Sequence, residues 1–499
     1  MAGKAWRASM LAASLAGALA LTGCGGAGDE KGGAASDVVT IGTSSVIKSD
    51  NPLDQSWSTY NFAVFDSLLK AGDEDFTEGG LATKWKIDGK TLTFTVRKGV
   101  KFQNGEALTA HDVAFSLNLT KKEGYAFSQN LDTFVSAKAK DDTTLIVTMT
   151  ATDPLGVQKV GMVPVVPRDY WEAKGLKGFL AKPIGSGPYR VLSYSPESGY
   201  DFEAHDGYWG KKPPTRRVNL RFYKDPQALE SALLSGQIQV AQALSASSAP
   251  NIKTNASLEL HAGYMGNTTM LQLNTTKAPF DDSKARRAAN LALDQAALVK
   301  TITHGTSEAE DGQVTFKGVA GYVADLHSQG YDPDEAKKLL ASSSYDGEEV
   351  RFVGTTLQQP LMEAVAGSLN EVGFKVKVEA LDVPVWLEQF RNGSDAQIFA
   401  RGMSYSGIND ASRAYRWLAT VNKPFVKDRE WLDLWKAQST ERDHDARVAL
   451  LEKATRMVNE KDYILFTYSQ SSPNATVKGV DGIRWLNPAM DFTGITYQP

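Results

Sequence analysis

The chain has 499 residues, of which 42% are apolar and 22% are charged, so it is neither a disordered nor a low-complexity protein. At about 150 residues per domain, this length indicates two or three domains. The 58 acidic residues outnumber the 54 basic ones and give a net charge of −4 at pH 7, which argues against a nucleic-acid partner. Cys24 is the single cysteine, which excludes disulfide frameworks, thiolate metal clusters and cysteine catalysis in the folded body.

Residues 1–23 are typical of an export signal. Lys4 and Arg7 form a positively charged start, and the apolar run 10–21 follows them. A helix needs about 20 apolar residues to cross a bilayer, and this run is shorter. We therefore expect a cleaved signal peptide rather than a permanent transmembrane helix.

The signal ends in Leu21-Thr22-Gly23-Cys24. This motif resembles the lipobox of bacterial lipoproteins, in which the signal is cut before the cysteine and the thiol receives a diacylglyceryl group. The resemblance implies a membrane lipoprotein that carries palmitate at Cys24, on the outer, periplasmic side of the cytoplasmic membrane. Two acyl chains hold a protein at a bilayer much better than one. Residues 24–37 are rich in glycine, alanine and charge, and predict a flexible tether.

From residue 38 onward the pattern predicts strands and helices in mixed order. Apolar strands are expected at 38–42 and at 91–96, where apolar residues alternate with threonines. Asp88-Gly89 predicts a tight hairpin turn before the second of these strands. Thr109 is followed three positions later by an acidic residue, the spacing of a capping box, so a helix is expected to begin there.

The middle of the chain predicts a parallel sheet. Asp281 or Asp282 is expected to cap one helix, and Asp332-Pro333 places a cap and a first-turn proline at the start of another. The order strand 350–353, helix 360–371 and strand 374–378 is typical of a crossover unit with two parallel strands. The sequence therefore predicts an α/β protein, which we interpret as two lobes joined by crossing strands.

No catalytic motif is present. The chain lacks G-x-S-x-G, H-E-x-x-H and Walker-type sequences, and its six histidines are scattered. We therefore predict no catalytic residue, no metal site and no cofactor. Two carboxylates distant in sequence could still form a hydrolase site, and this alternative stays open.

Five groups of residues occur in the order of a known family. The most specific is the stretch 81–117, and the others are Pro183–Tyr189 with Tyr208-Trp209, Ala232–Gly236, the residues from Asn274 to Asp294, and Tyr331–Leu340. In these groups the mature chain resembles the family 5 extracellular solute-binding proteins of ABC importers, the peptide- and nickel-binding type.

The resemblance implies a two-lobed periplasmic-binding-protein-like fold of type II, the large peptide-binding class, with an extra subdomain in lobe I. Lobe I would comprise residues 38–262, with the extra subdomain at about 55–181. Lobe II would comprise 263–470, and residues 471–499 would return to lobe I. The segments 263–273 and 466–471 are expected to be hinge crossings, with the ligand enclosed between the lobes.

The resemblance also implies a ligand site. In peptide-binding relatives, a tryptophan, a strand that ends in Gly-Trp and a nearby aspartate surround the peptide, and the aspartate pairs with its terminal ammonium. Gly402 falls on the glycine of this pattern, Met403 replaces the second aromatic residue and Ser406 replaces the aspartate. Serine carries no charge, and Asp410, four residues further on, could supply it only if the loop is shifted. A modified peptide, a cyclic peptide or a small non-peptide metabolite therefore remains open. The candidate ligand residues are Trp386, Met403, Ser404, Tyr405, Ser406 and Asp410.

These observations predict a monomeric substrate-binding lipoprotein of an ABC importer. It would capture oligopeptides or peptide-like solutes by hinge closure and deliver them to a membrane permease, whose ATPase subunits supply the energy. Two alternatives are a membrane-tethered secreted hydrolase and a ligand sensor with the same fold.

Overall fold

The computed structural model describes residues 36–45, 49–54, 58–72, 77–262, 267–405, 407–419, 424–486 and 489–499. The chain divides into two units, residues 1–34 and residues 35–499, and everything described here belongs to the second unit. The predicted signal peptide, the lipidation site Cys24 and the candidate ligand residue Ser406 lie outside the described residues.

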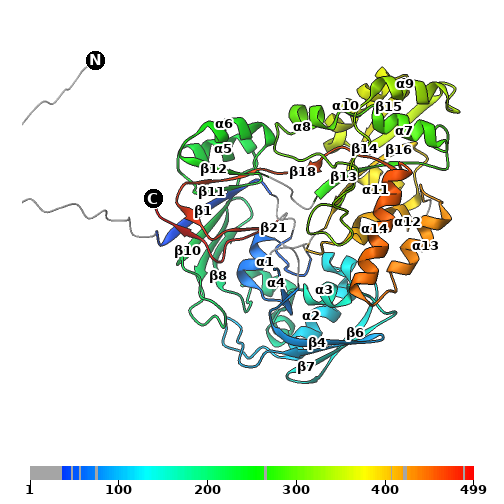
Figure 1. Cartoon of the computed structure of the whole chain (residues 1–499). Coiled ribbons are helices and arrows are strands. Elements are labelled where there is room, and N and C mark those ends of the chain that lie inside the picture. Colours follow the sequence, from blue (N-terminus) through cyan, green and yellow to red (C-terminus); the bar gives the residue numbers. More distant parts are fainter. Residues whose placement is uncertain are drawn as a thin grey trace, which may run out of the picture. The chain divides into compact units, whose positions relative to one another are not determined.

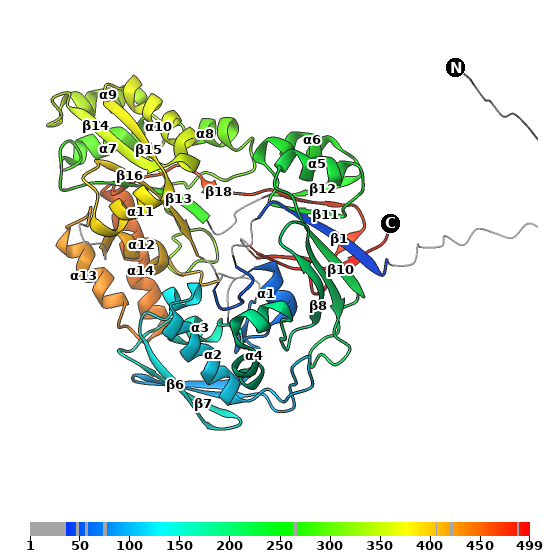
Figure 2. The ribbon, with the colours of Figure 1, turned by 180° about the vertical axis from the view of Figure 1, so that it is seen from behind.

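A mixed seven-stranded sheet forms the first layer of structure (Figure 1). Its order is β12-β19-β11-β1-β10-β9-β8, and β1 runs parallel to both of its neighbours. Helices α5 and α6 pack on the β11 and β12 end of this sheet (Figure 2). The strands are β1 (Val38–Thr43), β8 (Tyr189–Ser195), β9 (Gly199–Ala204), β10 (Arg217–Phe222), β11 (Val240–Gln242), β12 (Leu258–His261) and β19 (Asn474–Val477); the helices are α5 (Pro226–Leu234) and α6 (Ala249–Thr254).

An antiparallel four-stranded sheet of order β4-β5-β7-β6 is built from residues between β1 and β8. The predicted hairpin is present: Gly89 adopts a φ of +60° between β4 and β5, a conformation that glycine reaches without strain. The predicted capping box is present as well, because Asp112 accepts a hydrogen bond of 2.9 Å from the Thr109 N–H. The elements are β4 (Ala82–Asp88), β5 (Thr91–Val96), β6 (Phe134–Asp141), β7 (Thr144–Met149), α2 (Ala110–Glu123), α3 (Gly156–Gly161), α4 (Arg168–Ala181) and the 3-10 helix η1 (Ala126–Asn130).

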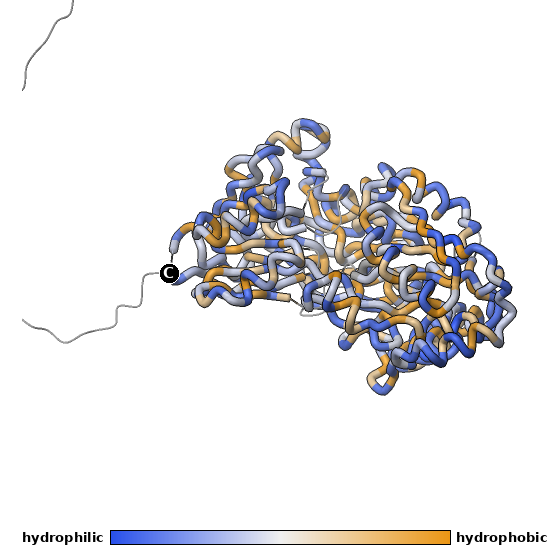
Figure 3. Tube along the Cα trace, turned by 90° about the horizontal axis from the view of Figure 1, so that it is seen from above, coloured by the Kyte–Doolittle hydropathy of each residue, from blue (hydrophilic) through white to orange (hydrophobic). Residues whose placement is uncertain are grey.

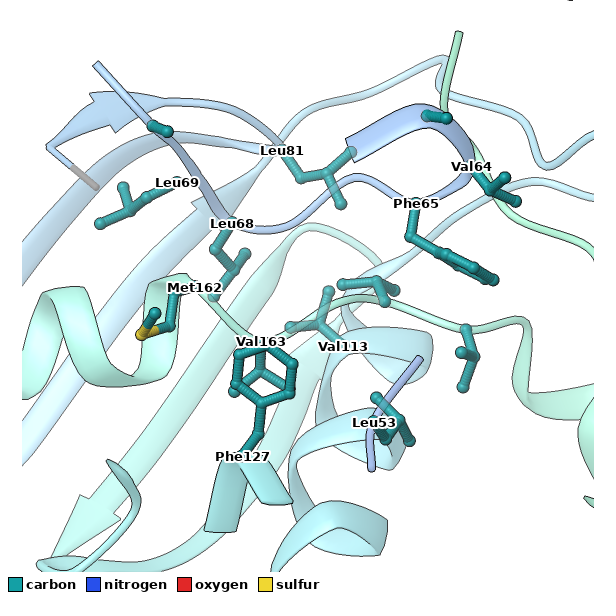
Figure 4. Close-up of a cluster of buried hydrophobic side chains, with 14 of the residues drawn as sticks. Leu53, Val64, Phe65, Leu68, Leu69, Leu81, Val113, Phe127, Met162 and Val163 are labelled. Carbon is teal, nitrogen blue, oxygen red and sulfur yellow. The ribbon is translucent and has the colours of Figure 1, made fainter. Parts of the chain in front are cut away.

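A continuous apolar core joins these two sheets. Figure 4 shows part of it, where side chains from the segment after α1 (Thr59–Val64) meet side chains from α2, η1 and the end of α3. Val113 on α2 and Phe127 on η1 are both 1% exposed. Apolar and polar stretches alternate along the whole trace (Figure 3), as expected where each element buries one face.

The second large sheet has the order β15-β14-β16-β13-β17, with β18 also paired to β13. The predicted crossover unit is confirmed: β14 and β15 are parallel, and α10 connects them and packs against both. The capping residues of α7 and α9 are Asp282 and Asp332. The strands are β13 (Asn267–Leu273), β14 (Glu349–Thr355), β15 (Lys375–Leu381), β16 (Ile398–Ser404), β17 (Ile464–Leu465) and β18 (Ser469–Gln470); the helices are α7 (Ser283–Leu291), α8 (Gln295–Ile302), α9 (Pro333–Ala341), α10 (Gln359–Glu371), α11 (Val383–Asn392), α12 (Ala411–Ala419), α13 (Arg429–Gln438) and α14 (His444–Glu460).

Two short stretches of chain connect the first sheet with the second. One runs from the end of β12 to the start of β13, and the other comprises residues 471–473 between β18 and β19. The predicted crossings, 263–273 and 466–471, include β13 and β18, which are hydrogen-bonded to each other within the second sheet. The connections are therefore shorter than the sequence indicated.

Candidate functional site

The candidate ligand residues gather around β16 and the two helices next to it in sequence, α11 and α12. Strand β16 buries alternate residues on opposite faces, as strands do. Ala400 joins the core that α10 covers, whereas Phe399 and Met403 face two other apolar clusters. Ser404 pairs with the backbone of Asn267 in the ladder between β16 and β13.

Trp386 lies on α11 and is half-buried. Its Nε1–H donates a hydrogen bond of 3.1 Å to the Ala400 carbonyl, which attaches α11 to β16. Its ring stacks on Phe390 and Phe399, with centroids 5.3 and 5.6 Å away. These contacts build a row of aromatic rings and leave part of the indole exposed. Contact between Trp386 and the ligand stays a prediction.

Met403 and Tyr405 lie in the interior between β16 and the helices α12 to α14. Met403 is 5% exposed and Tyr405 is fully buried. The Tyr405 hydroxyl donates a hydrogen bond of 3.1 Å to the Val314 carbonyl, and its ring meets Phe316 edge-on at 5.4 Å. These contacts give both residues a role in packing, and ligand contact at either one stays a prediction.

Asp410 is buried just before α12 and is held by an arginine. Arg447 on α14 donates two hydrogen bonds to its carboxylate, of 2.6 and 2.9 Å, and both side chains are at most 6% exposed. One carboxylate oxygen also accepts the Ser412 N–H at 2.9 Å. A ligand ammonium at Asp410 would therefore have to compete with a buried two-point ion pair, which is among the strongest side-chain interactions.

Three arginines that we did not single out from the sequence lie in the same region: Arg401, Arg413 and Arg416, called here the arginine cluster. The guanidinium carbon of Arg401 is 4.1 Å from the ring centroid of Phe390 and 4.7 Å from that of Trp417. Arg416 lies 4.1 Å from the same Trp417 ring. The spacing of Arg413 and Arg416 on one helix was visible in the sequence; their proximity to Arg401 was not.

Arg401 is 3% exposed, and its Nε and Nη1 atoms have no hydrogen-bond partner among the residues that the structure describes. Burial, together with the positive charge of Arg416, lowers the pKa of Arg401 to about 9. Removing a charged group from water costs several kcal/mol, whereas cation–π contacts return about 0.5–2 kcal/mol each. The aromatic rings therefore do not fully offset the burial of this charge.

Arg413 also contacts the part of the chain that carries the four-stranded sheet. Its Nη1 donates a hydrogen bond of 2.9 Å to Asn130 Oδ1, at the end of η1. A second contact of this kind joins Arg442 to Thr152 at 3.1 Å. Burial lowers the pKa of Arg413 to about 10, with Arg416 adding to the effect and Asp132 and Asp410 opposing it. The cluster therefore lies where elements from distant parts of the sequence meet.

Two features are absent from the described residues. No group of three or more histidine, cysteine or acidic side chains in these ranges could hold a metal ion. Within the same ranges, no helix combines the length and apolar character that a bilayer crossing requires.

Residues 77–425 match the family model described as bacterial extracellular solute-binding proteins, family 5 middle. The chain belongs to this family. The family consists of non-enzymatic solute-binding proteins of ABC transporters that work outside the cytoplasm, so the predicted family and the absence of catalysis are confirmed, and the hydrolase alternative is not supported.

Among curated relatives, the dipeptide-binding protein of Escherichia coli K12 is 25% identical over 431 residues, 77% of this chain and 79% of the relative. The nickel-binding periplasmic protein of the same organism is 27% identical over 368 residues, 68% of this chain and 70% of the relative. The names of these relatives include different ligands, so they establish a solute-binding protein without identifying its solute.

Solved structures show the same fold. The periplasmic binding protein DppA from Helicobacter pylori, in complex with peptide STSA, superposes with a TM-score of 0.75 at 21% identity and covers 93% of this chain and 98% of its own. AgaA from A. tumefacien R10, in complex with agropinic acid, gives 0.72 at 23% identity and covers 90% and 95%. HbpA2 from Haemophilus parasuis gives 0.81 at 20% identity and covers 93% and 100%. The predicted α/β periplasmic-binding-protein fold is thereby confirmed.

Proposed function

We propose that this protein captures oligopeptides or peptide-like solutes by hinge closure and delivers them to an ABC permease, whose ATPase subunits supply the energy. The observation that carries the proposal is the pair of short connections between the two large sheets, from β12 to β13 and from β18 to β19. Two connections of a few residues between the same two sheets would permit one part to rotate relative to the other, which is how hinged binding proteins close on a ligand.

The relatives support a peptide as the solute. The site argues against one class of peptide, the linear peptides that are recognised by a free amino terminus. The names of similar proteins include dipeptides, and one structural relative holds peptide STSA. The carboxylate of Asp410 is already paired with Arg447, so it is poorly placed to receive the amino terminus of a linear peptide. Agropinic acid in a structural relative supports a second candidate, a small carboxylate-bearing solute that is not a peptide.

Native mass spectrometry of the full chain purified from its host tests the proposal. We expect a solute that remains bound without being altered, and a Tm that falls by several degrees when the solute is removed, because ligand binding stabilises the folded state. Re-addition of the solute should restore the Tm. Products chemically different from the added solute would contradict the proposal. A bound solute that is never transported by cells carrying the chain would favour the sensor alternative instead.

We also propose that the protein is held at the outer face of the cytoplasmic membrane by lipid at Cys24. Its support is the sequence motif at residues 21–24, directly after the signal segment. Replacing Cys24 by serine is expected to move most of the protein from the membrane fraction to the soluble one and to abolish incorporation of labelled palmitate. Ser36→Ala, a change within the tether, is the matched control and should leave both readouts unchanged. Retention of the serine variant in membranes would contradict the lipid anchor.

A further inference from the structure

We infer that the arginine cluster receives an anionic group of the solute, a carboxylate or a similar oxyanion, and so selects solutes of net negative charge. This inference rests on the proposed function, since it assigns the chemical class of the captured solute. It concerns three residues that lie outside the ligand positions expected from the family pattern.

The first observation is the state of the Arg401 guanidinium. The guanidinium carbon lies 4.1 Å from the ring centroid of Phe390 and 4.7 Å from that of Trp417, and these two rings contact each other edge-on with centroids 4.9 Å apart. A cation–π contact uses none of the guanidinium N–H groups, so these donors stay available for a carboxylate or phosphate. Two of its three nitrogens, Nε and Nη1, are buried without a partner among the described residues.

The second observation is the balance of charge. In the described part of the chain, neither Arg401 nor Arg413 makes an ion pair. Two acidic groups act on Arg413 at longer range, and both are already engaged: Asp410 pairs with Arg447, and Asp132 pairs with Lys159 at 3.0 Å. Positive charge therefore exceeds negative charge here, and an anion would balance it.

The third observation is the position of the cluster. Arg401 comes from β16 and Arg413 from α12, whereas Asn130, which accepts the Arg413 hydrogen bond, comes from η1 in the other part of the fold. In this structure η1 and α12 are in contact through that hydrogen bond, and opening of the hinge would separate them. An anion held by the cluster would then favour the closed form, because it neutralises a charge that closure buries.

A purely structural role makes a different prediction from an anion site. If Arg401 serves only to pack against the aromatic rings, its loss should destabilise the protein whether or not an anion is present. If it awaits an anion, replacing it by an apolar side chain of similar length should stabilise the ligand-free protein, because a buried uncompensated charge disappears.

The test compares probes that differ mainly in charge, with the full purified chain freed of bound solute. The probes are the dipeptides Ala-Glu, Ala-Ala and Ala-Lys, with agropinic acid as an anion that is not a peptide. We expect calorimetry to show at least tenfold tighter binding of Ala-Glu or agropinic acid than of Ala-Lys. Tighter binding of Ala-Glu would indicate that the site takes a peptide carboxylate. Tighter binding of agropinic acid would indicate a carboxylate that is not part of a peptide.

The variant Arg401→Met should weaken binding of the preferred anion at least tenfold and raise the Tm of the ligand-free protein. Arg401→Lys retains the charge but loses the planar guanidinium and its fixed set of donors, so its affinity should lie between those of the wild type and Arg401→Met. The control is Arg456→Met on α14, where an exposed arginine pairs with Asp325, and it should leave anion binding unchanged.

The outcomes distinguish failure of the anion site from failure of the proposed solute capture. Equal binding of Ala-Lys and Ala-Glu, or an Arg401→Met protein that binds anions normally, would overturn the anion site and leave solute capture intact. A lower Tm of ligand-free Arg401→Met would also count against the anion site and favour a packing role. Failure of every probe to bind would contradict capture of peptides and carboxylate solutes altogether, and the anion site with it.

Discussion

Replacing Asp410 by asparagine is expected to lower the free energy of unfolding of the ligand-free protein by about 3–5 kcal/mol, the range typical for breaking a buried ion pair from one side. The carboxylate receives two hydrogen bonds from Arg447, and neither side chain is more than 6% exposed. The variant leaves the Arg447 charge buried, with Gln438 and Ser412 as its remaining partners. Urea unfolding followed by circular dichroism measures the change.

Two further variants decide whether the ion pair is the cause. Asp88→Asn removes an exposed carboxylate, 80% accessible, that lies 3.7 Å from Lys86, and it should cost less than about 1 kcal/mol. The double variant Asp410→Asn with Arg447→Met removes both charges and should recover much of the lost stability. If Asp410→Asn alone unfolds like the wild type while losing affinity for peptides with a free amino terminus, Asp410 acts on ligand and our structural interpretation is wrong.

Glu310 is expected to make the protein less stable as the pH rises from about 5 to 8. Its buried carboxyl group accepts hydrogen bonds from Thr268 and from the Thr467 N–H, the latter of 2.7 Å. Burial raises the pKa of Glu310 from 4.5 to about 8, even though these two hydrogen bonds lower it. The folded protein therefore keeps a proton at this group that the unfolded chain has already released.

The sign of the effect follows from proton linkage. Because the folded state binds more protons than the unfolded state between about pH 4.5 and 8, stability from this group is complete below that window and is lost as the pH rises through it. One pKa unit corresponds to about 1.4 kcal/mol, so the loss by pH 7 is on the order of 3 kcal/mol.

The variant Glu310→Gln tests this assignment. The amide oxygen can accept the Thr467 N–H and the amide nitrogen can donate to the Thr268 hydroxyl. The amide has no proton to lose, so the variant should be more stable than the wild type at pH 7 and nearly equal to it at low pH. The free energy of unfolding is measured against pH for the wild type and for Glu310→Gln. Subtracting one profile from the other removes the contribution of all other titrating groups. Glu388→Gln on the exposed surface of α11 is the control and should follow the wild-type profile. Parallel profiles of Glu310→Gln and the wild type would show that Glu310 stays ionised in the folded state.

Local features of the fold could be predicted from the sequence because they depend on residues a few positions apart. The Asp88-Gly89 hairpin, the Thr109 cap and the Asp332 cap each involve hydrogen bonds or backbone angles within three or four residues. The crossover unit of β14, α10 and β15 depends only on the period of its apolar residues. Neighbouring residue types determine these features before any tertiary contact forms.

The candidate site was predicted only in outline. The sequence pattern led to the right strand, β16, and to the half-buried Trp386, but it did not indicate that Tyr405 would be fully buried. It also treated Asp410 as an available carboxylate, because its partner Arg447 lies 37 residues further along the chain. The partner of a buried charge is chosen by packing, and no local pattern records it.

The sequence by itself determined the family, the mixed α/β architecture and the positions of most caps and turns. Only the tertiary structure decided the surroundings of the buried ionisable groups: Asp410 meets Arg447, Glu310 meets Thr268 and Thr467, and Arg401 lies against two aromatic rings with two donors that have no partner among the described residues. The physical reason is that the energy of a buried charge depends on every group within a few ångströms of it. In this protein those groups come from strands and helices that are far apart in sequence.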